Sequence, residues 1–177
     1  MKLIGEITQL DRDWEKSKFL PIRGLPAKKK GKFGEDMYKL YLKNKGIKAY
    51  PKKSTSYDIK TKDDCIEVKL ATRTNRDKRG NYSLTFFQIR QKQKYDKIVF
   101  VCIYPDRIDI RQISKKDFME FVIKHPKQIV WAGGKEKKAS CGGDIRKNDL
   151  FHFIIPNDIW GKKFNLLLSL KEKCDII

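Results

Sequence analysis

The order of segments along this chain predicts an α/β fold, a single domain in which helices flank a mixed central β-sheet. A helical pattern of apolar residues comes first, and a strand-rich segment follows it. Residues 98–104, IVFVCIY, form a continuous apolar run with β-branched side chains, which is typical of a strand buried on both faces. A length of 177 residues suits one domain, so the range 1–177 is expected to fold as one unit.

The first part of the chain is expected to contain a long helix and a β-hairpin. Apolar residues with helical spacing mark a helix over 33–45, and Gly46 follows it as a glycine often follows a helix. Strands are expected over 56–60 and 65–70, with a polar turn between them. The apolar stripe of the helix consists of Phe33, Met37, Leu40 and Tyr41.

The rest of the chain is expected to alternate strands and helices after a polar, basic loop at 72–81. In the range 114–177 the sequence predicts a helix, a basic loop, a strand and a C-terminal helix over 158–173. Ser114 is a favourable N-cap for the first of these helices, which runs through Ile123. The other expected elements are a short helix over 84–95 and strands over 98–104, 107–112, 129–131 and 150–155.

Three charged side chains of the predicted hairpin are expected to share one patch. Glu67 and Lys69 are two residues apart on one strand, so their side chains point to the same face. If the turn centres on residues 62–63, the residue opposite Glu67 on the neighbouring strand is Asp58. Val68 then points to the opposite face, into the core.

Two carboxylates and a lysine in one patch are the residue types that metal-dependent phosphodiester hydrolysis requires. Mg²⁺ prefers oxygen ligands and keeps several waters in its shell. Beside a phosphate, such a cation neutralises developing charge and acidifies a water molecule, and a nearby lysine can orient that water. A ladder of charged side chains on a solvated sheet face, without any chemistry, is the other interpretation of the same residues.

The spacing of Asp58, eight further residues and then Glu67-x-Lys69 resembles the signature of the PD-(D/E)XK nucleases, the superfamily of most type II restriction enzymes. Tyr57 stands where the family name has proline. The likeness covers about residues 31–113, where a helix precedes the hairpin and a basic loop, a helix and a buried strand follow it. The resemblance implies a restriction-endonuclease-like fold with this range as its catalytic core.

The resemblance also implies further site residues. In the family, the helix before the hairpin often carries a glutamate that joins the metal site, and Glu35 in the segment GKFGE matches it. Gln88, near the start of the next expected helix, is implied to reach the metal-bound water or a phosphate. The implied metal ligands are Asp58, Glu67 and Glu35, with Mg²⁺ as the cofactor and Mn²⁺ as a substitute. Lys69 and Gln88 complete the implied catalytic set.

The implied activity is Mg²⁺-dependent cleavage of double-stranded DNA, as in a sequence-specific type II restriction enzyme. A homing endonuclease, a junction resolvase or a repair nuclease would use the same chemistry on a different substrate. A basic nucleic-acid-binding protein without catalysis is the alternative in a different class. An intact set of two carboxylates and a lysine argues against that alternative, because binding alone does not need it.

The charge of the chain points to a polyanionic partner. Formal net charge is +19, so the chain repels itself unless something negative binds, although a lysine-rich surface without a binding role is the competing interpretation. Cations that pair with phosphates release counterions, and basic segments are therefore expected to contact DNA. The expected contacts are Lys28, Lys29, Lys30, Lys32, Arg73, Arg76, Lys78, Arg79, Arg90, Lys135, Lys137, Lys138, Arg146 and Lys147.

Assembly and location follow from similar arguments. A duplex has two strands of opposite polarity, so coordinated cleavage calls for two sites related by a twofold axis, and a homodimer is expected. A small catalytic subunit that depends on a larger specificity partner is the alternative. The sequence contains no apolar stretch of about 18 residues and no secretory signal at its N-terminus, so no membrane partner and a cytoplasmic location are expected.

Overall fold

The computed structural model describes residues 12–51, 55–131 and 150–171, and within these ranges the chain forms two β-sheets flanked by helices. The larger sheet contains, in spatial order, β1 (Ile59–Lys60), β2 (Cys65–Thr72), β4 (Lys97–Ile103), β5 (Arg107–Ser114) and β8 (Asn165–Lys171). The smaller sheet contains β3 (Ser83–Arg90), β7 (Leu150–Pro156) and β6 (Ile129–Trp131). Strands β2 and β4 are parallel and the other pairs are antiparallel, so the mixed α/β fold predicted from the sequence is confirmed.

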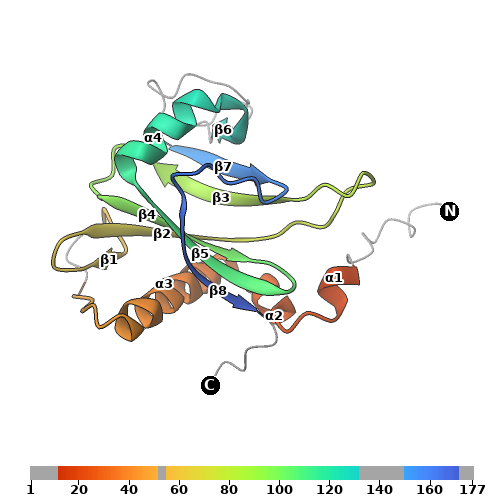
Figure 1. The fold of residues 1–177 in the computed structure, drawn as a ribbon, viewed down its shortest axis with the longest axis horizontal. Helices are drawn as coiled ribbons and strands as arrows, with labels where there is room; N and C mark the ends of the chain where they lie inside the picture. The colour runs from red at the N-terminus through yellow and green to blue at the C-terminus, as the bar shows by residue number, and fades with distance from the viewer. Residues whose placement is uncertain (1–11, 52–54, 132–149, 172–177) are drawn as a thin grey trace.

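The larger sheet is the middle layer of the molecule (Figure 1). The smaller sheet and α4 (Lys115–Lys124) cover one of its faces, and a short 3₁₀ turn, Pro126–Gln128, follows α4. The other face is covered by α1 (Arg12–Glu15), α2 (Leu20–Arg23) and α3 (Ala27–Asn44). None of the helices in the described ranges is both long and apolar enough to cross a lipid bilayer.

Strand β4 is the centre of the core because both of its faces are buried, as its unbroken apolar run predicts. Val99, Val101 and Ile103 pack toward the helices, in a cluster that also contains Tyr38 and Leu42 of α3. The alternate side chains point toward the smaller sheet. Burying this much apolar surface on both sides of one strand fixes the larger sheet between its two covering layers.

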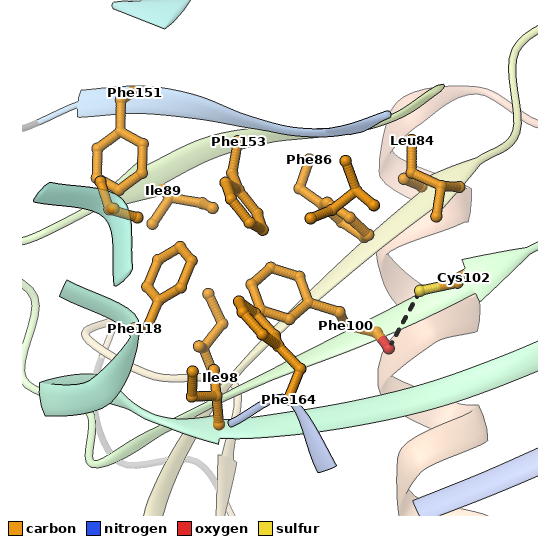
Figure 2. Close-up of a cluster of buried hydrophobic side chains, with 14 of the residues drawn as sticks. Leu84, Phe86, Ile89, Ile98, Phe100, Cys102, Phe118, Phe151, Phe153 and Phe164 are labelled. Atoms are coloured by element: carbon orange, nitrogen blue, oxygen red, sulfur yellow. Dashed lines mark hydrogen bonds between the residues drawn. The ribbon is translucent and has the colours of Figure 1, made fainter. Parts of the chain in front are cut away.

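Phenylalanine rings fill the space between the two sheets and α4 (Figure 2). Phe100 of β4 lies at the centre, with its ring centroid 4.7 Å from that of Phe86 on β3 and 5.6 Å from that of Phe153 on β7. Phe118 of α4 and Phe164, which precedes β8, complete the contacts at 5.5 and 5.9 Å. Rings at such separations pack in tilted and edge-to-face arrangements that add to the stabilisation from burial.

The long helix differs from the prediction in its start and in its buried face. It begins at Ala27 rather than at Phe33, directly after Pro26, whose extended backbone precedes the first turn. The residues of α3 that are fully buried are Gly34, Tyr38 and Leu42, whereas Leu40 of the predicted stripe is 47% exposed. The end of the helix is confirmed: Gly46 has φ +70°, the left-handed conformation that glycine adopts without strain.

The helix expected over 84–95 is wrong, because residues 83–90 form strand β3. A β-bulge shifts the pairing with β7 between Phe86 and Ile89, and Gln88 has φ +57°. The bulge interrupts the alternation, so buried residues fall at 84, 86 and 89, and the period of two that identifies a strand is lost.

The C-terminal helix expected over 158–173 is also wrong, because residues 165–171 form strand β8. This strand pairs with β5 in an antiparallel ladder, with Ile110 opposite Leu168. Leucine and lysine favour helices in isolation, but pairing with a distant strand overrides that preference here.

The other predicted strands and the helix after Ser114 agree with the predictions apart from small shifts of their ends, and the basic loop predicted between Trp131 and Leu150 lies outside the residues that the structure describes. Strand β1 is shorter than the expected 56–60. Helix α4 begins after Ser114, whose hydroxyl accepts a hydrogen bond from the backbone N–H of Asp117 at 3.0 Å, so the predicted N-cap is confirmed. A free N–H of the first turn is satisfied in this way.

Candidate active site

The β1–β2 hairpin fixes the relation between the first two predicted site residues. Ile59 lies opposite Ile66 in the ladder. Just before the first residue of β1, the backbone N–H of Asp58 donates to the carbonyl oxygen of Ile66 at 2.9 Å, which extends the contact between the two strands. The two pairs of the ladder, Ile59–Ile66 and Lys60–Cys65, have the register predicted from the sequence, and Asp58 lies just outside this ladder, with its N–H bonded to Ile66.

The side chain of Asp58 is attached to the neighbouring strand. Its Oδ2 accepts a hydrogen bond from the backbone N–H of Val68 at 2.9 Å. On the same strand, Lys69 Nζ lies 2.7 Å from Glu67 Oε1. Val68 is the residue between Glu67 and Lys69, so the Asp58 carboxylate is held beside this ion pair. Glu67 is only 4% exposed, and Lys69 is partly buried.

Alternation along β2 directs Glu67 and Lys69 away from α3 and toward the smaller sheet. Val68 and Leu70 point to α3 instead, where the helix approaches closely at Gly34. A Cβ atom on Gly34 would lie 3.2 Å from Leu70 Cβ and 3.7 Å from Val68 Cγ1, so a larger residue would push against β2. The glycine therefore lets α3 support the strand that carries the candidate site.

Glu35 lies on α3, which covers the opposite face of the larger sheet. Its carboxylate is 3.7 Å from Lys39 Nζ, one helical turn further along. Within residues 12–51, 55–131 and 150–171, no three or more His, Cys, Asp or Glu side chains gather as a metal-binding group. The structure thus brings Asp58, Glu67 and Lys69 together and leaves Glu35 outside their group.

Gln88 is placed on the bulge of β3 and not at the start of a helix. Its side chain is exposed, and its backbone N–H donates to His152 Nδ1 at 3.1 Å. The imidazole of His152 is also near the ring of Phe87, with centroids 4.9 Å apart, and partial burial lowers its pKa. The structural basis on which Gln88 was expected to reach the site, a helix start, is therefore absent.

The first set of expected DNA contacts lies on α3. Lys28, Lys29, Lys30 and Lys32 occupy its first two turns rather than a loop that leads into it. Burial and the nearby charge of Arg23 lower the pKa of Lys30. A hydrogen bond to Asp36, at 2.8 Å, raises the pKa of Lys32.

The second set follows β2 and differs in accessibility from residue to residue. Arg73 is only 2% exposed, and its Nη2 is 3.2 Å from Asp13 Oδ2. Arg76, Lys78 and Arg79 are exposed. Arg73 is therefore buried and paired within the fold, whereas the exposed cations of the loop are the ones that a duplex can reach.

The remaining expected contacts are divided between a strand end and an undescribed segment. Arg90 is exposed at the end of β3, opposite Leu150 of β7. The others, Lys135, Lys137, Lys138, Arg146 and Lys147, lie outside the residues that the structure describes.

A second polar cluster was not predicted from the sequence. Asp158 accepts hydrogen bonds from Tyr104 Oη and, at 2.6 Å, from Trp160 Nε1 and Arg107 Nη2. Burial raises the pKa of Tyr104. The buried Asp109 of β5 accepts from Arg107 Nε at 3.2 Å. One signal was available: in the alternation R-I-D-I-R, the aspartate lies on the face opposite two isoleucines, so it needs partners of its own.

Chemically, the hairpin offers two carboxylates and an ammonium group within one small patch. Carboxylate oxygens are the ligands that Mg²⁺ and Mn²⁺ prefer, and the backbone hydrogen bond holds Asp58 in place before any cation binds. The Glu67–Lys69 ion pair places an ammonium nitrogen 2.7 Å from an oxygen of the nearly buried Glu67 carboxylate. This donor set suits a hard divalent cation.

Comparison with known proteins gives no family assignment. The chain matches no family model, no curated protein and no solved structure.

Proposed function

We propose that this protein is a Mg²⁺-dependent DNA endonuclease that hydrolyses phosphodiester bonds in double-stranded DNA, in the manner of a sequence-specific type II restriction enzyme. One observation carries the proposal. The Asp58 carboxylate is hydrogen-bonded to the Val68 N–H, directly beside the ion pair of Glu67 and Lys69. The likeness of this motif to the PD-(D/E)XK signature supports the same assignment.

Asp58 and Glu67 would hold the cation, which supplies charge neutralisation at the phosphate and a more acidic water. Asp58 is oriented for this role by its hydrogen bond to β2. Lys69 would leave its contact with Glu67 to orient the attacking water or to stabilise negative charge on the phosphate. Glu35 and Gln88 remain proposed participants only if substrate binding moves them toward the hairpin.

The proposed substrate follows from charge as well as from the motif. A net charge of +19 favours a polyanion, and Arg76, Lys78 and Arg79 are exposed on the loop that follows β2. A homodimer in the cytoplasm, cutting a short palindromic site, is part of the proposal. A larger specificity subunit is the alternative assembly, and light scattering with and without DNA distinguishes the two.

The first test is incubation of the purified protein with phage-length DNA and Mg²⁺. Discrete fragments support a restriction enzyme, and a smear supports a nuclease with little sequence preference. Cleavage confined to branched or damaged substrates would instead support a junction resolvase or a repair nuclease, and a single long site would support a homing endonuclease. The Lys69→Ala variant serves as the control for contaminating nucleases.

A non-catalytic nucleic-acid-binding protein is the second candidate, and one observation favours it. Glu67 and Lys69 already neutralise each other at 2.7 Å, as a purely structural pair would. In that case the wild type and Lys69→Ala would bind DNA equally and neither would cleave it with Mg²⁺ or Mn²⁺. Cleavage by the wild type alone would exclude this candidate.

A further inference from the structure

A pocket of about 350 Å³ opens where the chain leaves the C-terminal ends of β2 and β4. Lys16, Arg73 and Arg76 supply cations to its wall, Tyr82 supplies an aromatic surface, and Asp13 supplies a carboxylate. The pocket is separate from the candidate active site, which lies further back along β2. Asp58, Glu67 and Lys69 do not line it.

Two guanidinium groups converge on a single carboxylate oxygen in this pocket. Asp13 Oδ2 accepts from Arg73 Nη2 at 3.2 Å and from Arg76 Nε at 3.1 Å. A carboxylate brings one negative charge to these groups and to Lys16. A phosphate would bring up to two charges and a third acceptor oxygen, and arginine pairs bind phosphate through the same charge-assisted hydrogen bonds.

The guanidinium groups are held in place before any ligand binds. The centres of both, on Arg73 and Arg76, are 5.1 Å from the centroid of the Tyr82 ring. The loop that carries them is folded as a hairpin: Asp77 N–H donates to the Asn81 carbonyl oxygen at 2.8 Å, and Arg76 Nη1 donates to the Gly80 carbonyl oxygen at 3.1 Å. A preformed site loses less conformational entropy on binding.

Asp13 can be displaced without unfolding its helix. The neighbouring Trp14 is fully buried, and its ring is flanked by the guanidinium groups of Arg23 and Arg73 at 4.9 and 5.9 Å. The side chain of Asp13, in contrast, is 45% exposed. Rotation of that one side chain would uncover the arginine pair while Trp14 keeps α1 in position.

Arg107 also lines the pocket, but it does not take part in the proposed site. Its guanidinium donates to three carboxylates, on Asp106, Asp109 and Asp158, at distances from 2.6 to 3.4 Å. Those carboxylates offset its charge. The cations for a ligand are therefore Lys16, Arg73 and Arg76.

We propose that the pocket formed by Lys16, Arg73, Arg76 and Tyr82 is a phosphate-binding site, which the Asp13 carboxylate occupies as an intramolecular substitute for phosphate. The recognised chemistry is a phosphate group, either in a polynucleotide or free in solution. Assigning it to a DNA strand rests on the proposed function, whereas phosphate binding itself does not.

The test is calorimetric titration with inorganic phosphate in EDTA at constant ionic strength. Asp13→Asn removes the competing charge and is expected to tighten binding about tenfold, and Arg76→Gln is expected to weaken it about tenfold. Arg79→Gln is the matched control, because Arg79 is an exposed cation of the same loop that does not line the pocket. Equal effects of Arg76→Gln and Arg79→Gln, or no gain with Asp13→Asn, would overturn the proposal.

A second pair of variants covers the case in which Asp13→Asn destabilises the fold. Lys16→Gln is expected to weaken phosphate binding, and Lys18→Gln, which changes an exposed lysine outside the pocket, is expected to leave it unchanged. Equal affinities of these two variants would count against the site.

A competition experiment then identifies the source of the phosphate. If the site binds a DNA phosphate, inorganic phosphate will displace duplex DNA from the wild type more readily than from Arg76→Gln. If phosphate binds but does not compete with DNA, the site is retained and its assignment to DNA is wrong. The phosphate titrations are run in EDTA and without cleavage, so failure of the proposed nuclease activity is distinguishable from failure of this site.

Discussion

Strand β2 carries charged clusters of opposite character at its middle and beyond its C-terminal end. In the middle, Glu67 pairs with Lys69 two residues away, and Asp58 joins them through the adjacent strand. Beyond the end, Arg73 pairs with Asp13, which is 60 residues away in sequence. The first cluster is built by one hairpin, whereas the second requires the N-terminal helices to fold against the sheet.

Under the proposed function, the difference lets one strand contact both the cation and the phosphate that phosphodiester hydrolysis needs. Carboxylates in the middle suit a cation, and guanidinium groups beyond the end suit a phosphate. Lys69 and Arg73 are four residues apart, which is on the order of 13 Å along an extended strand. A bound nucleic-acid strand could reach both clusters at once.

Removal of divalent cations should have the largest effect, because it should abolish the function proposed for the carboxylate cluster and leave that of the basic cluster intact. EDTA is expected to remove all detectable DNA cleavage, because the carboxylate cluster depends on a cation, while DNA binding through the basic cluster persists. Mg²⁺ or Mn²⁺ should restore cleavage, and Ca²⁺ should support binding without cleavage. Gel assays of cleavage and binding on the same samples measure both effects. Undiminished cleavage in EDTA would contradict the proposed chemistry.

Substitutions in the β1–β2 hairpin should have the second-largest effect on the rate of cleavage. Asp58→Ala, Glu67→Ala and Lys69→Ala are each expected to slow cleavage by about 10³-fold, the loss typical of a group that stabilises charge in the transition state. Single-turnover cleavage rates measure the effect, and circular dichroism checks the fold. Glu35→Ala is the comparison variant. It should slow cleavage much less, because Glu35 lies outside the group formed by Asp58, Glu67 and Lys69. A Lys69→Ala variant with the wild-type rate would show that Lys69 has no catalytic role.

The hairpin was predictable from the sequence because its information is local. The short turn sets the register, and the register sets which side chains share a face, so Asp58, Glu67 and Lys69 could be grouped without a structure. In the same way, Ser114 identified the start of α4.

Elements that depend on distant partners were not predictable. The bulge at Gln88 hides the alternation of β3 and exists because β3 pairs with β7, a strand that is remote in sequence. Strand β8 acquires its conformation from β5. For the same reason, the sequence placed Arg73 in a polar, basic loop among the expected DNA contacts, and only the tertiary structure shows Asp13 beside it.

Stability should distinguish the buried cation beyond β2 from its exposed neighbours. Arg73→Ala is expected to lower the free energy of unfolding by about 2–3 kcal/mol, because it leaves a cavity and removes contacts with Asp13 and Tyr82. Arg79→Ala should change it by no more than about 0.5 kcal/mol, as is usual for an exposed site. Urea denaturation followed by circular dichroism measures both. Equal losses of unfolding free energy in the two variants would mean that the buried contacts of Arg73 do not stabilise this region.

The smallest expected effect is on the salt dependence of DNA binding. It shows whether an individual cationic side chain contacts a DNA phosphate. Each phosphate neutralised by the protein contributes about −0.9 to the slope of log affinity against log salt concentration. Replacing one exposed cation that contacts a phosphate should therefore make the slope shallower by about that amount. Arg79→Ala tests an exposed cation after β2, and Arg90→Ala tests one at the end of β3. Each variant should lose affinity for DNA by a similar factor whatever the base sequence.

Fluorescence anisotropy of a labelled duplex over a range of salt concentrations, in EDTA, gives these slopes without cleavage. Lys32→Ala is a useful third variant, because Lys32 is paired with Asp36 and its removal should alter the slope less than that of an exposed arginine on the loop. If all three variants keep the wild-type slope, the duplex does not contact these cations. The basic charge near β2 would then serve the phosphate pocket alone, and the two clusters of this strand would act on different ligands.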